Sequence, residues 1–260
     1  MQVGQKCSNI GSKAELGRYP FIINICTNIV KFWIHALKSD AHSLIYQAAV
    51  CDKNDNVCGF YQVVKKILNG LCDPEKVIDH DISTFGVKLK THLMKKYERT
   101  FFDKINPVLN KSNKLREYQK VKKVYKFEKY LYIKNKEKAK SITKVRLSSN
   151  NFPIELGRRY DISAEKRFCF MCNNKQKGDE KHMLLLCPNI KLFECRNAFL
   201  NDIMSINHQL LVLTSDDIYH YILSAHDDVH TYFKFCYFHI IKNRCCMRQF
   251  LGRPIQTKRG

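Results

Sequence analysis

Apolar residues recur every three or four positions near the start of the chain, which is the spacing of one face of an α-helix. Between residues 20 and 38 this stripe consists of Phe21, Ile25, Ile29, Phe32, Trp33 and Leu37. A periodicity of this kind predicts an amphipathic helix. Pro20 suits the first helical position, because its fixed φ fits a helix and an N–H there would have no partner. We therefore predict a helix over residues 20–38.

The same pattern returns in shorter pieces further along the chain. Residues 43–50 and 57–68 each carry it, and Asn69-Gly70 provides a helix stop, because glycine takes the left-handed conformation that ends many helices. Thr84 is a candidate N-cap for a helix to about residue 104, where Asn106-Pro107 would break it. Residues 1–84 are thus predicted to be a helical region.

Aromatic and aliphatic residues are interleaved with lysines across residues 85–150. This pattern indicates amphipathic elements with one packed face and one basic face, rather than a disordered tail. Further on, residues 214–217 (TSDD) have the form of a capping box before an apolar run, so a helix is expected there. Residues 229–250 form another long helical candidate that becomes basic toward its end. The predicted fold class is mainly α.

Composition and charge indicate what kind of partner the chain binds. The chain has 260 residues, 45% of them hydrophobic and 12% aromatic, and a net charge of +21. Residues 88–146 hold 20 basic and 5 acidic side chains, which is +15 of that charge. Such an excess on a folded body favours a polyanion, with nucleic acid ahead of an anionic membrane. We divide the chain into a helical region (1–84), a basic helical region (85–150), a third module (151–200) and C-terminal helices with a basic tail (201–260).

The basic region supplies the predicted nucleic-acid contacts. Lysine and arginine neutralise phosphates with little sequence selectivity, so RNA and DNA are both candidate partners. The alternative is a lysine face that is merely solvated. The residues that we expect to contact phosphate are Lys95, Lys96, Lys111, Lys114, Arg116, Lys120, Lys122, Lys123, Lys126 and Lys129.

The sequence predicts an intracellular protein of the cytoplasm, the nucleus or both, with no membrane span. The best apolar run, residues 21–37, is interrupted by Lys31, and crossing a bilayer takes roughly 20 apolar residues. The first residues are polar, without the apolar core of a secretory signal. The 12 cysteines are too sparse for a disulfide scaffold, so grouped ones suggest metal and scattered ones are expected to be small buried side chains.

One group of cysteines has metal-ligand spacing, C-x2-C-x9-H-x4-C. It consists of Cys169, Cys172, His182 and Cys187. Zinc prefers four tetrahedral sulfur or nitrogen ligands, and two cysteines in one tight turn can approach a single ion. His182 and Cys187 are too far apart to share one face of an α-helical turn. Four protein ligands with no open position predict one structural zinc ion, although four unrelated side chains remain the alternative.

Several stretches, in order, resemble the region after the polymerase domain in non-LTR (LINE-type) retrotransposon reverse transcriptases. They are residues 15–25 (ELGRYPFIINI), 127–131 (FEKYL), 152–158 (FPIELGR), 167–172 (RFCFMC), 178–182 (GDEKH) and 186–188 (LCP). The resemblance covers about residues 14–200 and implies a reverse-transcriptase zinc-binding knuckle with the four ligands named above. The chain departs from the family beside the knuckle, at Leu156 and at Arg159, but not at those ligands.

No residues for polymerisation accompany this resemblance. Two-metal phosphoryl transfer needs closely placed carboxylates, and both Asp-Asp pairs, at 216–217 and 227–228, lack the preceding aromatic of a polymerase turn. Walker loops, Gly-x-Ser-x-Gly and His-Glu-x-x-His motifs are also missing. We therefore expect no enzyme activity, but a nucleic-acid-binding fragment or remnant of a retroelement protein. The alternative is a zinc-stabilised protein-interaction module without nucleic-acid contact.

Overall fold

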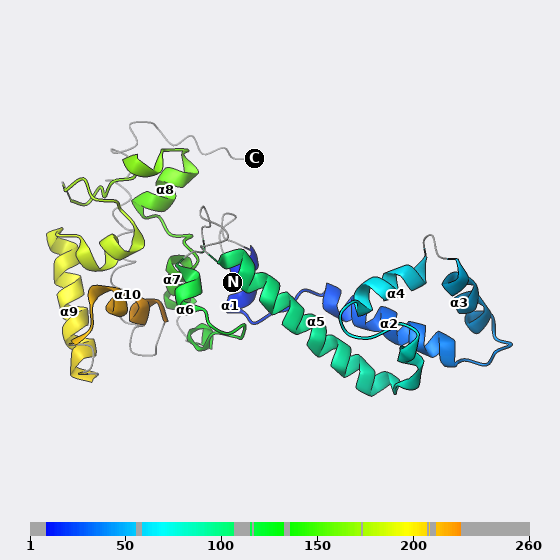
Figure 1. Ribbon diagram of the computed structural model, residues 1–260. Coiled ribbons are helices and arrows are strands. Elements are labelled where there is room, and N and C mark those ends of the chain that lie inside the picture. Colours follow the sequence, from blue (N-terminus) through cyan, green and yellow to red (C-terminus); the bar gives the residue numbers. More distant parts are fainter. Residues whose placement is uncertain are drawn as a thin grey trace. The chain divides into compact units, whose positions relative to one another are not determined.

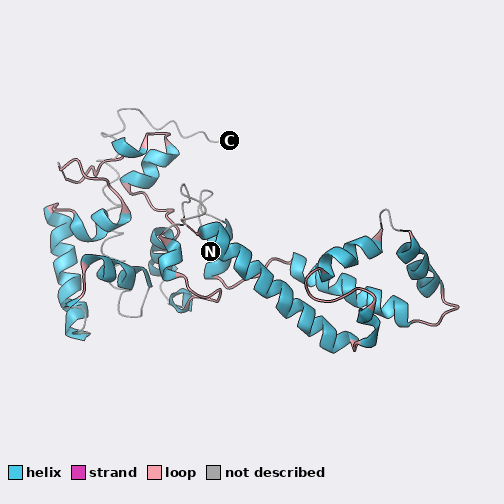
Figure 2. Cartoon of the chain, viewed as in Figure 1, coloured by secondary structure: helices cyan, strands magenta, loops and turns pink. Residues whose placement is uncertain are grey.

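A computed structural model describes residues 9–55, 59–106, 115, 117–132, 136–172, 174–206, 208 and 212–224. These residues are mainly helical, as the sequence predicts, and no named strand occurs among them (Figures 1 and 2). The α-helices are α1 (Asn9–Glu15), α2 (Ile22–Lys38), α3 (Leu44–Asn54), α4 (Phe60–Leu68), α5 (Ile82–Ile105), α6 (Tyr118–Val121), α7 (Lys136–Arg146), α8 (Pro153–Arg159), α9 (Ile190–Ile206) and α10 (Ser215–Ser224). The shorter helical turns are η1 (Lys76–Asp79), η2 (Lys129–Tyr132), η3 (Ala164–Lys166) and η4 (His182–Leu186).

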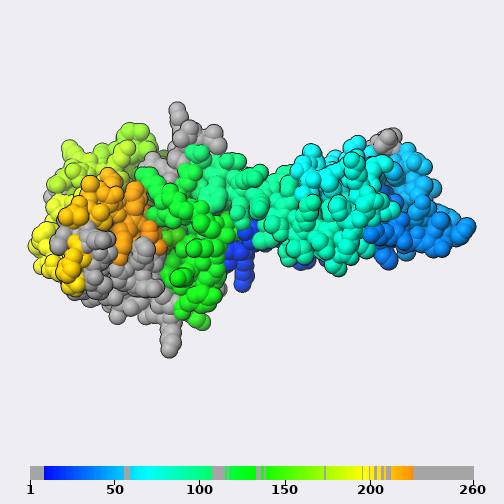
Figure 3. All heavy atoms as spheres, turned by 60° about the horizontal axis from the view of Figure 1, so that its bottom comes forward, coloured from blue at the N-terminus to red at the C-terminus, as the bar shows by residue number. Residues whose placement is uncertain are grey.

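The chain forms two compact units, and the first is discontinuous in sequence. Residues 1–17 and 105–260 belong to unit 1, whereas residues 18–104 form unit 2. This division differs from the predicted one at residue 84, because α5 runs unbroken from Ile82 to Ile105. Phe85 and Leu89 of α5 belong to the same core as residues of α2 and α4, so the boundary predicted at residue 84 falls inside unit 2. The space-filling view colours unit 2 from blue to teal (Figure 3).

Unit 2 is built by helices that the apolar spacing predicts. Trp33, the only tryptophan of the chain, packs in its core against Tyr61, with ring centroids 5.4 Å apart. Ser43 caps α3 by accepting from the Tyr46 N–H. The remaining buried residues of this core are Val30, Ile34, Ala36, Ala49, Val64, Leu68, Val77, Phe85 and Leu89. The predicted helices 20–38, 43–50 and 57–68 correspond to α2, α3 and α4.

The start of α5 corrects one prediction. The helix begins at Ile82, two residues before the predicted cap Thr84. The cap is Asp81, whose carboxylate accepts from the Thr84 N–H at 2.8 Å, so that Thr84 lies inside the first turn. Aspartate serves this position as well as threonine does, and Phe85, in the first turn of the helix, is part of the core.

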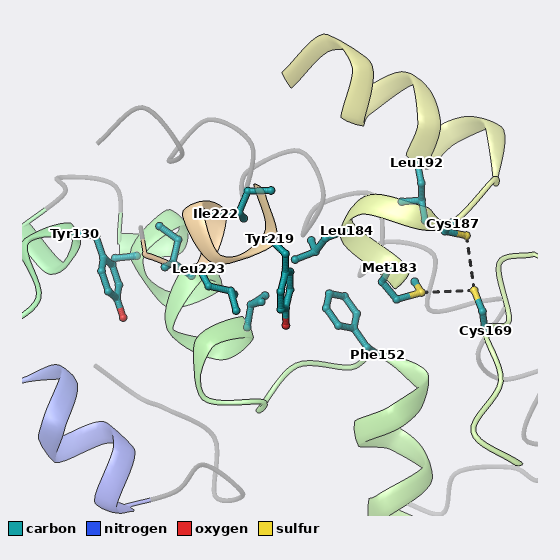
Figure 4. Packing of buried hydrophobic residues seen from close by; sticks show 13 residues of the cluster. Tyr130, Phe152, Cys169, Met183, Leu184, Cys187, Leu192, Tyr219, Ile222 and Leu223 are labelled. Atoms are coloured by element: carbon teal, nitrogen blue, oxygen red, sulfur yellow. Dashed lines mark hydrogen bonds between the residues drawn. The ribbon is translucent and has the colours of Figure 1, made fainter. Parts of the chain in front are cut away.

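The core of unit 1 lies between the basic region and the segment with the four candidate ligands. Phe152, Leu184, Tyr219, Ile222 and Leu223 pack together there with Met183 (Figure 4). The predicted capping box before α10 is present: the Asp217 N–H donates to Thr214 Oγ1, and the Asp217 carboxylate accepts from the Thr214 N–H. The predicted helix over residues 229–250 lies outside the described residues.

A buried charged cluster joins α1 to the rest of unit 1. Glu15, at the end of α1, accepts hydrogen bonds from the hydroxyls of Tyr118 and Tyr130 and from Nε and Nη2 of Arg146. The Arg146 guanidinium lies 5.6 Å and 5.4 Å from the centroids of those two rings. Burying charges is costly unless they are paired and hydrogen-bonded, and here they are. The cluster therefore holds α1 against residues more than a hundred positions away.

No helix in the described part of the chain is long and apolar enough to cross a membrane.

Candidate metal centre

The first two candidate ligands lie in a small hairpin. Phe168 and Lys177 form an antiparallel bridge, the Cys169 N–H donates to the Gln176 carbonyl at 2.8 Å, and the Gly178 N–H donates to the Arg167 carbonyl at 3.0 Å. Cys172 lies three residues beyond Cys169 in the turn of this hairpin. The turn directs both sulfurs to one point, as the C-x2-C spacing predicts.

Of the other two ligands, His182 begins a π-helical turn and Cys187 directly follows it; the sequence analysis did not foresee this turn. Asp179 starts this segment by accepting from the His182 N–H at 2.8 Å. The turn is η4, and the Cys187 N–H closes it by donating to the His182 carbonyl at 2.7 Å. In an α-helix, side chains five apart point about 140° away from each other. The wider i→i+5 turn brings His182 and Cys187 to the same side.

The four ligand atoms lie within 4.8 Å of one another, and the group could hold a metal ion. Cys169 Sγ and Cys187 Sγ are 3.7 Å apart, and Cys172 Sγ is 3.4 Å from His182 Nε2. Tetrahedral zinc with ordinary bond lengths would separate two sulfurs by about 3.8 Å, and a sulfur from a nitrogen by about 3.6 Å. The spacing thus fits one small tetrahedral ion.

Backbone N–H groups point at two of these sulfurs. The Met171 and Cys172 N–H groups donate to Cys169 Sγ, the first at 3.3 Å, and the Asn189 N–H donates to Cys187 Sγ. Such donors stabilise a thiolate. Without a metal, burial raises the pKa of Cys169 to about 12, raises that of Cys187 and lowers that of His182. A bound cation would therefore displace protons from the thiols.

The neighbouring residues fix the positions of the ligands. A Cβ on Gly178 would lie closer than 3.0 Å to the ring of Pro153, so the hairpin packs directly on the start of α8. Asn189 Nδ2 donates to the Met171 carbonyl at 3.0 Å, and Arg196 Nη2 donates to the Cys187 carbonyl at 2.8 Å. Cys169 and Cys187 are themselves buried in the core of unit 1. The site is therefore continuous with the core.

Met183 is a neighbour that the sequence analysis missed. Its Sδ lies 3.6 Å from Cys169 Sγ (Figure 4), and its side chain is buried in the same cluster. The signal in the sequence is its place directly after His182, on the turn that carries a ligand. The thioether closes the apolar side of the site, so we assign it packing rather than ligation.

The predicted phosphate contacts are distributed over both units. Lys95 and Lys96 are exposed on α5 of unit 2. Four exposed lysines of unit 1 lie in the segment from α6 to η2: Lys120, Lys123, Lys126 and Lys129. Lys120 is paired with Glu117 at 2.9 Å. The predicted contacts at Lys111, Lys114 and Arg116 lie outside the described residues.

Lys122 is a correction to that set. Its side chain is only 1% exposed, and its ammonium pairs with Glu128 and donates to the Lys126 carbonyl. Burial lowers the pKa of this ammonium, and the partner Glu128 opposes the effect. An amine enclosed in this way cannot reach a phosphate. Lys122 belongs instead to the buried cluster around Glu15, because Arg146 lies 3.6 Å from the same Glu128 carboxylate.

Comparison with known proteins adds no relative: no family model, no curated protein and no solved structure matches the chain.

Proposed function

We propose that this chain is a non-catalytic nucleic-acid-binding protein whose unit 1 is stabilised by one structural zinc ion. The observation that supports the nucleic-acid part comes from the segment from α6 to η2. Its lysines are exposed, whereas the tyrosines beside them, Tyr125 and Tyr130, are buried. A basic surface on a packed scaffold is the form that sequence-nonspecific phosphate binding takes.

The zinc part is supported by the donor set. Three sulfurs and one imidazole are soft or borderline ligands, which favour zinc over magnesium or calcium. All four positions of a tetrahedron are filled by protein atoms, which is typical of a structural ion rather than a catalytic one. Zinc there would link the hairpin, η4 and the core of unit 1.

Metal analysis of the purified chain tests this assignment. We expect one zinc ion per chain, lost in Cys172→Ser and kept in Cys72→Ser. The two cysteines are a matched pair, since both are partly exposed and only Cys172 belongs to the site. Zinc retained in Cys172→Ser would contradict the proposal. A wild-type chain that is equally stable with and without zinc would contradict it as well.

Binding to labelled nucleic acid across a salt series tests the main proposal. Affinity for single-stranded RNA should fall steeply between about 50 mM and about 200 mM salt, because bound lysines release counterions from the phosphates. Replacing Lys123, Lys126 and Lys129 together by glutamine should weaken binding and flatten this dependence. Affinity that is absent at low salt, or unchanged over the series, would reject nucleic-acid binding.

The competing proposal, a protein-interaction module, is favoured by one observation in unit 2. The exposed large apolar side chains there include Phe21, Ile22, Ile25 and Phe32, all on or next to α2. Exposed apolar groups of this size are typical of protein contacts. Two results together would favour this second function: Ile25→Asp abolishes binding to a protein partner, and the chain shows no salt-dependent RNA binding.

We also propose that the chain derives from the post-polymerase region of a non-LTR retrotransposon reverse transcriptase. The ordered motifs that end in the C-x2-C, His and Cys ligands support this origin. Sequencing the genomic DNA directly upstream tests it. An in-frame polymerase with its aromatic-x-Asp-Asp turn would support the proposal, and an upstream region with no trace of a polymerase would count against it.

A further inference from the structure

One aromatic side chain of the basic region is exposed where its neighbours are buried. Tyr132 is 78% exposed, whereas Tyr118, Tyr125 and Tyr130 are each at most 4% exposed. Its ring lies against Phe127, with ring centroids 4.7 Å apart and an angle of 45° between the planes. The pair therefore places an exposed aromatic ring, supported by a second ring, on an otherwise charged segment.

Exposed lysines lie beside this pair. Lys129 and Tyr132 are the first and last residues of the 3₁₀ turn η2, and side chains three apart in such a turn lie on one side. Lys126 directly precedes Phe127 and is also exposed. The ion pairs among the described residues of this segment use Lys120 and Lys122, not Lys126 or Lys129. The green surface that includes this segment is visible in Figure 3.

The buried cluster fixes the backbone beneath the pair. Leu16 and Phe127 form an antiparallel bridge, and the Glu128 N–H donates to the Glu15 carbonyl at 2.9 Å. The buried ammonium of Lys122 donates to the Lys126 carbonyl at 2.7 Å. The loop that carries Phe127 is therefore held from α1 and from the core. A surface fixed before the ligand arrives loses less conformational entropy on binding.

We propose that Phe127 and Tyr132 form a stacking platform for an unpaired base of a single-stranded nucleic acid, with Lys126 and Lys129 contacting the flanking phosphates. The inference rests on the proposed nucleic-acid binding and adds a preference for single strands. Every base has a face that can stack on an aromatic ring, but in a duplex that face is covered by neighbouring bases. Exposed aromatic and basic groups on one turn therefore match a single strand better than they match the phosphate backbone of a duplex.

The test uses the full chain and RNA strands of about 12 nucleotides, with 2-aminopurine as a fluorescent base. Three variants are compared with wild type. Tyr132→Ala removes the exposed ring, Tyr132→Trp keeps a stacking surface, and Tyr160→Ala removes another exposed tyrosine of unit 1, which lies outside the basic segment. Tyr132 is exposed, so circular dichroism and zinc content should be unchanged in its variants. A DNA strand and an RNA duplex of the same sequence complete the set.

We expect Tyr132→Ala to weaken single-strand binding by between about 5-fold and about 150-fold, with the salt dependence unchanged because no phosphate contact is lost. Quenching of 2-aminopurine should also disappear in this variant, whereas Tyr132→Trp and Tyr160→Ala should behave like wild type. Duplex affinity should be lower and insensitive to Tyr132→Ala. Wild-type-like affinity and quenching in Tyr132→Ala would overturn the platform while leaving nucleic-acid binding intact. A wild type that binds no nucleic acid at low salt would overturn both.

Discussion

Replacing Glu15 by glutamine should destabilise unit 1 more than any exposed substitution does. The change keeps the shape of the side chain but removes its charge. Glu15 and Glu128 face Arg146 and Lys122 in the buried cluster, so the variant leaves that group with one unbalanced positive charge. The amide oxygen would also have to accept the four hydrogen bonds that the two carboxylate oxygens share.

The expected size of the effect follows from this burial. Removing one partner of a buried pair costs about 3–5 kcal/mol, a large share of the roughly 5–15 kcal/mol by which a domain is stable. For a unit of this size, 1 kcal/mol changes Tm by about 2–4 °C. The variant should therefore lose between about 6 °C and about 20 °C. The double variant Glu15→Gln/Arg146→Met should lose less than the sum of the two single changes, because the uncompensated charge is gone.

Thermal unfolding followed by two signals tests this reasoning. Far-ultraviolet circular dichroism records both units, whereas tryptophan emission records unit 2 alone, because Trp33 lies in its core. We expect the circular dichroism transition to move and the emission transition to stay. The control is Glu137→Gln, an exposed glutamate of the same unit whose pair with Lys140 is 3.4 Å long and contributes little. A Glu15→Gln variant within about 2 °C of this control would refute the assigned role of the cluster.

Three further outcomes are expected. With free zinc about 1,000-fold above its Kd, zinc binding adds about 4 kcal/mol to the free energy of unfolding of unit 1. Chelation should therefore lower the Tm of unit 1 by about 8–16 °C, and an unchanged Tm would exclude a structural ion. In urea unfolding, Gly17→Ala should lower the free energy of unfolding clearly more than Gly70→Ala does. Both glycines have positive φ, +56° and +82°, but only at Gly17 would a Cβ meet backbone atoms, those around Phe127, while Gly70 has open space. Equal costs would contradict this packing. Burial raises the pKa of Tyr118 and Tyr130 well above the ordinary value of 10.0. Their contribution to stability is thus complete below pH 10 and is lost above it, by up to about 1.4 kcal/mol per pH unit for each tyrosine. The lowered pKa of Lys122 offsets part of this loss, and melting curves between pH 8 and pH 11 should flatten when both tyrosines are replaced by phenylalanine.

The features that the sequence predicts are those encoded over short distances. The apolar stripe of α2, the stop at Asn69-Gly70 and the capping box at Thr214 and Asp217 each involve residues a few positions apart, and the structure contains all three. The four candidate ligands were found in the same way, since their spacing limits how they can meet. Residues that are close together in the sequence were sufficient to predict each of these features.

The features that the sequence does not reveal depend on partners far along the chain. Lys122 has the surroundings of a surface lysine in sequence, and nothing near it indicates Glu15 or Arg146 as neighbours. The π-helical turn before Cys187 is another example, because an insertion in helical geometry has no characteristic residue pattern. Glu15 itself carried one signal, its place in the first of the stretches on which the proposed retrotransposon origin rests, but that signal did not indicate burial.

The discontinuity of unit 1 has a consequence for the order in which the chain acquires its structure during synthesis. Unit 2 is contiguous, so its residues can meet as soon as they leave the ribosome. Glu15 must wait for Arg146, which lies 131 positions later. At translation rates of about 5–20 residues per second, that interval lasts about 7–26 s. For this period the Glu15 carboxylate has no guanidinium partner, whereas the inserted unit 2 has time to fold. Nascent chains stalled before and after residue 146 should differ in the protease resistance of α1, and that comparison would time the closure of unit 1.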